Sequence, residues 1–119
     1  ELEYINAGHV PPVLVHNNRA ELLNKGTTIL GIFEELPKVE FGSITIKPDT
    51  TIVSFTDGLS EMEDENGTRF GQKRLTDFAL LHYHLSPETF NKLLYENVSK
   101  FKGNVLSNDD ISVLTAKFL

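Results

Sequence analysis

Hydrophobic and polar residues alternate along several short stretches in the first half of the chain, which is the period of β-strands. This pattern predicts strands at residues 2–6, 12–16, 21–23, 41–47 and 51–55, and a strand or strand-loop segment at 27–33. The turn residues Ala7, Gly8 and His9 between the first two stretches predict a hairpin. Short turns join the other strands as well, so we expect a largely antiparallel sheet.

The second half of the chain changes to helical spacing. Apolar residues recur from Gln72 onward, at Leu75, Phe78, Ala79 and His82. A second helix is predicted to begin at Ser86, because serine is a good N-cap and Pro87 suits the first helical position. It should end at Gly103. A last strand is predicted at residues 111–118, so the chain is predicted to be α+β, with both helices packed on a sheet.

Composition narrows the class of protein. The 119 residues are 39% hydrophobic and 24% charged, which is typical of one small globular domain. The net charge of -6 argues against nucleic acid or an anionic membrane as a partner. The absence of cysteine excludes disulfides, thiol nucleophiles and cysteine-bound zinc. The longest apolar run, at residues 29–33, is too short to span a bilayer, and we expect a cytoplasmic location.

Two acidic pairs of residues carry the candidate chemistry. Asp57 and Gly58 follow the predicted strand at 51–55, and Asp109 and Asp110 precede the last strand. If these strands pair antiparallel, both turns lie at the same edge of the sheet. Converging carboxylates repel unless a cation or a shared proton lies between them, and oxygen ligands suit magnesium or manganese. Two ordinary Asx turns explain the same residues, so a metal site and a structural role both remain open.

Several other side chains have a functional and a structural interpretation. His9 faces a phosphate or fixes the shape of its turn, and Glu61 either supports the acidic site or is simply solvated. Arg69 and Arg74 bind phosphate or pair with neighbouring loop and helix groups. The acidic loop at residues 63–65 steers a cation, contacts a partner, or is a solvated loop.

Four stretches of the chain also resemble the motifs of a known family. They are NAGHVPP at residues 6–12, FTDGLSE at 55–61, GTRFGQKRL at 67–75 and DDISVL at 109–114. In this order and spacing they resemble the SpoIIE-like, or RsbU-like, branch of the PPM (type 2C) metal-dependent serine/threonine protein phosphatases. The resemblance extends over nearly the whole chain.

The resemblance implies a four-layer α-β-β-α sandwich with two manganese or magnesium ions at one edge. A metal-activated water would attack a phosphoserine or phosphothreonine directly, without a phospho-enzyme. By motif position Asp57 and Asp109 are metal ligands, Asp110 gives a supporting hydrogen bond, and Gly58 keeps the turn tight. The implied substrate is a phosphorylated anti-sigma-factor antagonist in bacterial signalling.

The chain departs from the family in one large respect. The N-terminal half of the domain is missing from these 119 residues, and with it the Asp-Gly motif whose carboxylate bridges the two ions. We therefore expect the C-terminal portion of a single phosphatase domain that alone binds metal weakly, has little or no activity, and self-associates through uncovered strand edges. The alternatives are a catalytically dead relative that binds proteins and an unrelated α+β ligand-binding domain.

Overall fold

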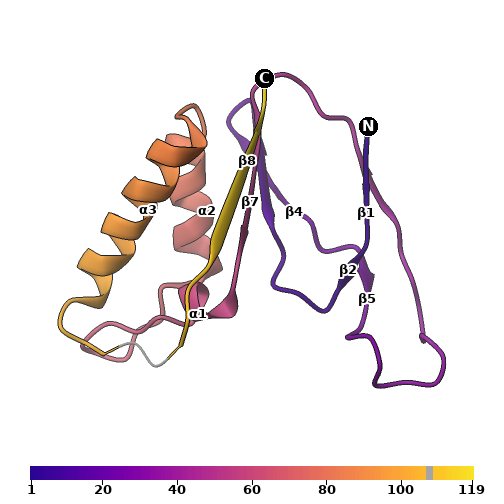
Figure 1. Cartoon of the computed structure of the whole chain (residues 1–119), viewed down its shortest axis with the longest axis horizontal. Coiled ribbons are helices and arrows are strands. Elements are labelled where there is room, and N and C mark those ends of the chain that lie inside the picture. The colour runs from indigo at the N-terminus through magenta and orange to yellow at the C-terminus, as the bar shows by residue number, and fades with distance from the viewer. Residues whose placement is uncertain (107–108) are drawn as a thin grey trace.

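The computed structural model describes residues 1–106 and 109–119 and consists of a helix-covered sheet and a projecting arm (Figure 1). We call residues 1–8 and 24–46 the arm. The molecule is flat, with extents of 44 × 37 × 19 Å. Its Cα radius of gyration is 15.4 Å, against about 13.5 Å for a compact chain of this length. Its apolar residues are therefore only partly covered.

The main sheet has four strands in the order β4-β3-β7-β8, and every pairing in it is antiparallel. Its strands are β3 (Val13–His16), β4 (Arg19–Leu22), β7 (Thr50–Phe55) and β8 (Val113–Phe118). Asn17 and Asn18 join β3 to β4 with φ of 48° and 59°. Asparagine tolerates such positive angles, which two-residue hairpins of this kind require. Strand β7 lies between β3 and β8 and is the longest central element of the sheet.

Three helices follow β7 along the chain: α1 (Asp57–Ser60), α2 (Gly71–His82) and α3 (Pro87–Lys102). Of these, α2 and α3 cover one face of the sheet, while α1 lies at its end (Figure 1). The predicted helix start is confirmed: the Ser86 hydroxyl accepts a hydrogen bond from the Thr89 amide at 3.3 Å, and Pro87 is the first helical residue. Gly103 ends the helix with a φ of 62°, an angle that favours glycine.

The hydrophobic core fills the space between the helices and the sheet. Its side chains come from β3, β7, all three helices and the segment between α1 and α2, and the largest of those that are fully buried are Phe55, Leu59, Phe70, Leu75, Phe90 and Leu94. Phe78 of α2 meets Phe90 of α3 edge to face, with ring centroids 5.3 Å apart. Such pairs add to the free energy gained by burying the rings, so this contact joins α2 to α3.

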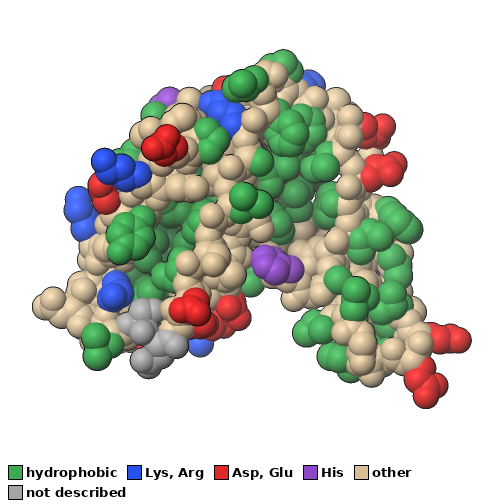
Figure 2. Space-filling view, viewed as in Figure 1, with side chains coloured by type: hydrophobic (Ala, Val, Ile, Leu, Met, Phe, Trp, Pro, Cys, Tyr) green, Lys and Arg blue, Asp and Glu red, His purple; other side chains and the backbone are tan. Residues whose placement is uncertain are grey.

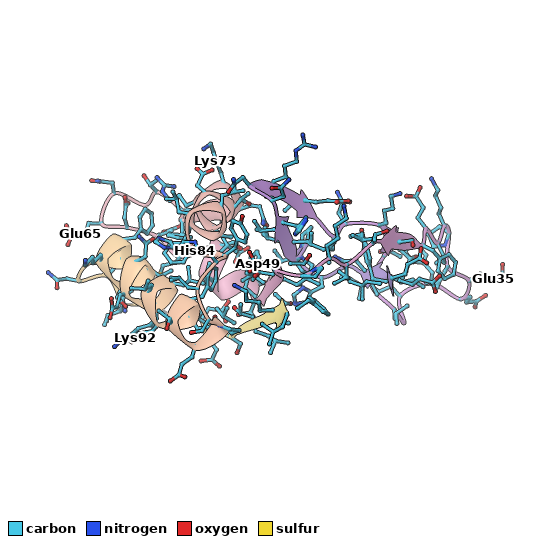
Figure 3. The ribbon with its side chains drawn as sticks, turned by 90° about the horizontal axis from the view of Figure 1, so that it is seen from above. Glu35, Asp49, Glu65, Lys73, His84 and Lys92 are labelled. Carbon is cyan, nitrogen blue, oxygen red and sulfur yellow. The ribbon has the colours of Figure 1, made fainter. Side chains whose placement is uncertain are left out.

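The arm is built from two short strand pairs and a long loop. Strand β1 (Leu2–Tyr4) pairs antiparallel with β6 (Gly42–Ile44), and β2 (Asn6–Ala7) pairs parallel with β5 (Gly26–Thr27). Glu35, in the loop at residues 28–41, lies at the far end of the arm (Figure 3). Many apolar side chains of this loop are exposed, and Figure 2 shows hydrophobic groups at its surface.

One prediction about this region is wrong: the first strand pairs with β6 and not in a hairpin with residues 12–16. Of the two alternatives for residues 27–33, the structure has the strand-loop segment, since β5 ends at Thr27. Gly26 explains the local path, because a Cβ there would lie 1.9 Å from the Asn6 carbonyl oxygen. Only glycine lets β5 run this close to β2. The apolar residues after Thr27 resemble a strand in sequence, but Ile29, Leu30, Ile32 and Phe33 are each more than half exposed and form no strand.

The predicted fold class is confirmed: helices and strands are mixed, and the sheets are mainly antiparallel. The four-layer sandwich stays a prediction. None of the helices in residues 1–106 and 109–119 is both long enough and apolar enough to cross a bilayer.

Candidate metal centre

The first candidate ligand, Asp57, stands at the end of β7. The β7–β8 ladder ends with the pair Phe55 and Val113. Thr56 extends the contact, because its amide donates to the Ser112 carbonyl at 3.0 Å and its hydroxyl accepts from the Ser112 amide at 3.0 Å. The same hydroxyl also donates to the Asp110 carbonyl at 3.3 Å. Asp57, the next residue, therefore leaves the sheet beside the segment that carries Asp109.

Gly58 lets the two segments come this close. It lies buried in the first turn of α1, where an added Cβ would be 2.3 Å from the Asp110 carbonyl oxygen and 3.4 Å from the Asp109 carboxyl carbon. Any side chain would push the two segments apart. The turn was predicted to need glycine for its tightness. The structure gives a different reason, which is the close approach of a second backbone.

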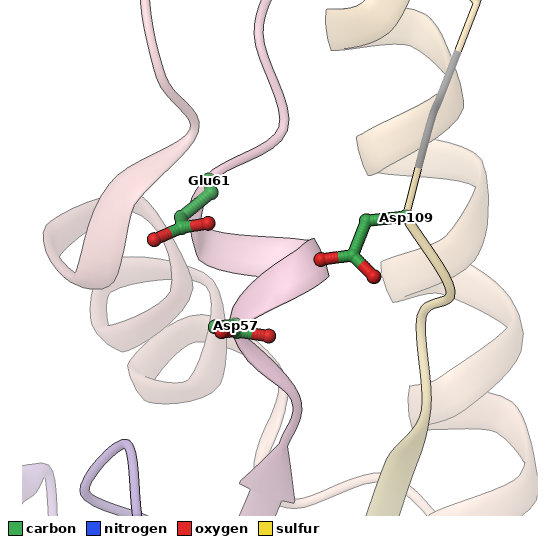
Figure 4. A group of neighbouring side chains, drawn as sticks. All are labelled: Asp57, Glu61 and Asp109. Atoms are coloured by element: carbon green, nitrogen blue, oxygen red, sulfur yellow. The ribbon is translucent and has the colours of Figure 1, made fainter.

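Glu61 completes the group from the other end of α1. Its amide donates to the Asp57 carbonyl at 2.8 Å, a helical i to i+4 bond that places both side chains on one face. Asp57, Glu61 and Asp109 each offer a carboxylate oxygen, and these three oxygens lie within 4.8 Å of one another (Figure 4). The three carboxylates come from one helical turn and the entrance to β8.

The electrostatics of this group favour a cation. All three carboxylates are exposed, and at this separation their negative charges repel. A divalent ion between them would remove that repulsion, and an all-oxygen donor set is the one that magnesium and manganese prefer. The residues present therefore fit a hard divalent ion.

The structure brings together Asp57 and Asp109, as the antiparallel pairing predicted. It adds Glu61, for which the sequence left ligand support and solvation equally open. The spacing of four residues between Asp57 and Glu61 is the sequence feature that places both side chains on one face of α1. Asp110 contributes through its main chain: its carbonyl accepts from Thr56, and its amide donates to the Asp109 carboxylate at 2.9 Å.

His9 lies outside this group of carboxylates. Its amide donates to the Asn6 side-chain oxygen at 2.8 Å, and its Nδ1 lies 2.7 Å from the Val10 carbonyl oxygen. These local contacts support a role in shaping the turn. A phosphate-binding role stays a prediction.

The family follows from comparison with known proteins. The model of the family described as "Stage II sporulation protein E (SpoIIE)" matches residues 1–119. The chain belongs to the SpoIIE family. Among curated proteins, Protein IcfG of Synechocystis sp. is 25% identical to this SpoIIE-family chain over 116 residues, which are 95% of the chain and 18% of IcfG.

Solved structures share its fold. The SiaA-PP2C domain of Pseudomonas aeruginosa matches with a TM-score of 0.83 at 19% identity, over 98% of this chain and 45% of that one. The PP2C phosphatase domain of Bacillus subtilis SpoIIE, solved with a fragment of its regulatory domain, matches at 0.76 and 17% identity, over 98% and 33%. The RsbU and RsbW domains of a Mycobacterium tuberculosis protein match at 0.73 and 25% identity, over 95% and 31%.

These likenesses place the sheet and helices of this SpoIIE-family chain in the PP2C fold. The chain spans less than half of each of these three structures and under a fifth of IcfG. The carboxylate group described above thus stands within a fold shared with larger phosphatase domains.

Proposed function

We propose that this chain forms part of a metal-dependent phosphoserine/phosphothreonine protein phosphatase. The observation that carries the proposal is the convergence of Asp57, Glu61 and Asp109 at the rim of a SpoIIE-family sheet. A solved structure of the B. subtilis SpoIIE phosphatase domain is described as presoaked with manganese, which supports manganese as a candidate ion.

The side chains have separate tasks in this proposal. Asp57 and Asp109 hold the ion from the two strand ends, and Glu61 adds a third carboxylate from α1. Gly58 and the Thr56 hydrogen bonds keep these strand ends together. Manganese or magnesium bound by these residues would supply a water activated for direct attack on phosphorus and would neutralise charge on the phosphoryl oxygens.

Three exposed carboxylates alone are proposed to hold the ion weakly, so the 119-residue chain by itself would hydrolyse little phosphate ester. The complete protein is proposed to act on a phosphorylated anti-sigma-factor antagonist. The family membership and the likeness to the RsbU and RsbW domains support this choice of substrate class.

Manganese binding to this chain, measured by titration calorimetry, tests the metal site. Asp57→Asn, Asp109→Asn and Glu61→Gln should each weaken binding at least about tenfold, because each removes a charged ligand or its support. Asp77→Asn and Glu96→Gln remove the same charges from the exposed faces of α2 and α3 and should leave the affinity unchanged. Equal affinity in the wild type and in Asp57→Asn would remove Asp57 from the site.

Hydrolysis of a phenyl phosphate ester by the complete protein separates the enzyme from the catalytically dead alternative. The enzyme requires manganese-dependent turnover in the wild type and its loss in Asp57→Asn. Manganese binding without turnover would instead favour a phosphatase-like protein-binding module.

A further inference from the structure

The loop between α1 and α2, at residues 61–70, begins at one of the three carboxylates of the candidate metal centre. Glu61 is its first residue, and the next residue, Met62, is buried in the core. The Phe70 amide donates to the Met62 carbonyl at 2.7 Å, so the two ends of the loop are joined beside Glu61. Whatever holds Phe70 in place therefore also affects where the Glu61 carboxylate lies.

Further hydrogen bonds close the loop between these ends. The Asp64 amide donates to the Thr68 carbonyl at 2.9 Å, and the Asp64 carboxylate accepts from the Asn66 and Thr68 amides, each at 2.9 Å. Glu63 and Arg69 lie opposite each other in an antiparallel bridge. Because the loop is closed in this way, a displacement of one end would be passed to the other.

Arg74, in the first turn of α2, holds the second end of this loop. Its Nη1 donates to the Arg69 carbonyl at 2.8 Å and to the Phe70 carbonyl at 3.0 Å. Its guanidinium carbon lies 4.8 Å from the centre of the Phe101 ring on α3, within the range of a cation–π contact. Phe70 meets the same ring edge to face, with centroids 5.3 Å apart. We call these two hydrogen bonds and the ring contact of Arg74 the Arg74 clamp.

The helix itself does not explain a cation at this position. The first turn of α2 contains no acidic residue, and Lys73 and Arg74 place positive charge near the helix N-terminus, where the macrodipole disfavours it. Lys73 lies 2.6 Å from the Asp77 carboxylate, whereas Arg74 donates to loop carbonyls. Of the two roles that the sequence left open for Arg74, phosphate binding and pairing with neighbouring groups, these contacts support the second.

We propose that Arg74 is a positioning residue of the metal centre, because its clamp on the loop fixes where the Glu61 carboxylate lies. The proposal rests on the metal site proposed above and requires no contact between Arg74 and the ion or the substrate. Without the clamp, Glu61 would spend part of its time away from the carboxylates of Asp57 and Asp109. Only the share of the metal affinity that Glu61 supplies should then depend on Arg74.

Manganese titration calorimetry on this chain tests the proposal through a double-mutant cycle. Arg74→Met keeps an apolar stem but removes the donors, and it should weaken binding about tenfold, the low end for a group that orients a metal ligand. In the Glu61→Gln background the same change should have little further effect, because the clamp acts through Glu61. Arg74→Lys keeps a charged nitrogen that can donate to the carbonyls and should restore most of the affinity.

Lys73→Met is the matched control, because it removes the same charge from the adjacent position of α2, where the side chain is 87% exposed. It should leave the affinity unchanged. Unchanged affinity in Arg74→Met, while Asp57→Asn and Glu61→Gln still weaken binding, overturns the proposal and leaves the metal site standing. Equal weakening by Arg74→Met in both backgrounds also overturns it, since a general loss of structure would act in this way. No weakening in Asp57→Asn or Glu61→Gln would overturn the metal site itself, and this inference with it.

Hydrogen exchange of the metal-free chain is a second measurement, which does not depend on ion binding. The amides of Asp64 and Phe70 close the loop and should exchange faster in Arg74→Met than in the wild type. The Phe90 amide, which donates to the Ser86 carbonyl at the start of α3, should keep its rate. Urea unfolding verifies that each variant folds, and Arg74→Gln replaces Arg74→Met if the latter does not. Unchanged exchange at both loop amides would overturn the proposal.

Discussion

The helix-covered sheet and the arm contain similar apolar residues but use them differently. In the sheet region Phe90 is completely buried, whereas Phe41 in the arm is 71% exposed. In the sheet region the helices face the sheet, so the apolar side chains between these two layers bury one another. The arm has short strand pairs and no helix over them. Apolar sequence alone therefore does not make a core, because a second layer must be present to cover it.

The largest difference between the two regions is expected when one aromatic residue in each is replaced by alanine. Phe90→Ala should lower the free energy of unfolding by about 3–5 kcal/mol, since it leaves a cavity in the core. Phe41→Ala should change it by about 0.5 kcal/mol or less, as exposed substitutions usually do. Urea unfolding followed by circular dichroism measures both. Similar losses would show that the arm is packed in solution.

Gly58→Ala is expected to have the next largest effect on folding stability, and whether it stabilises or destabilises the protein is informative. In an ordinary helix alanine in place of glycine stabilises by about 0.5–1 kcal/mol. Here the new Cβ would meet the Asp110 carbonyl, so we expect destabilisation by about 1–3 kcal/mol, as for overpacking. Manganese affinity should fall with it.

Ser60→Ala, in the same helix, serves as the control for Gly58→Ala and should have little effect on either measurement. If Gly58→Ala were more stable than the wild type, the Asp110 carbonyl before β8 would not press against α1 in solution. Such a result would weaken the claim that the sheet region positions the acidic group.

The smallest effect is expected in the arm, at the ion pair between Lys38 and Glu40, whose charged atoms lie 2.6 Å apart. The hydrogen bond from Lys38, and then its charge, lower the pKa of Glu40. A lowered carboxyl pKa contributes stability above the pKa of the unfolded chain, and this is lost as pH falls through the folded value. Both groups are exposed, so the effect on unfolding should be slight.

Lys38→Ala should return the pKa of Glu40 upward toward its ordinary range, as followed by a nuclear magnetic resonance titration of its carboxyl group. High salt should reduce the difference in Glu40 pKa between the wild type and Lys38→Ala, because salt screens the attraction between the two charges. An unchanged pKa would show that the pair does not form in solution.

The sequence was most informative where local signals agreed with packing. Ser86, Pro87 and Gly103 predicted the ends of α3, and the run into Asp57 predicted the end of β7. The antiparallel pairing of β7 with β8 was only a condition in the sequence reasoning; the structure meets it and brings Asp57 near Asp109.

Features that depend on contacts between distant residues were not predictable. The partner of β1 is β6, some forty residues away, and no local signal distinguishes it from the nearer β3. The need for Gly58 arises from Asp110, which another part of the chain supplies. Glu61 differs, because its spacing from Asp57 was visible but became meaningful only once α1 was known to be helical.

The antiparallel ladder of β7 and β8 has a consequence for the helices between them. Asp57 leaves one strand and Asp109 enters the next at the same end, so α1, α2 and α3 form one long excursion that begins and returns at the same point. A covalent cross-link over about fifty residues restricts the unfolded chain and so stabilises the folded one by about 4 kcal/mol at room temperature, and an ion that binds weakly contributes less. An ion held by both aspartates would thus fasten the whole helical layer at its base, and its loss would loosen helices that never touch it.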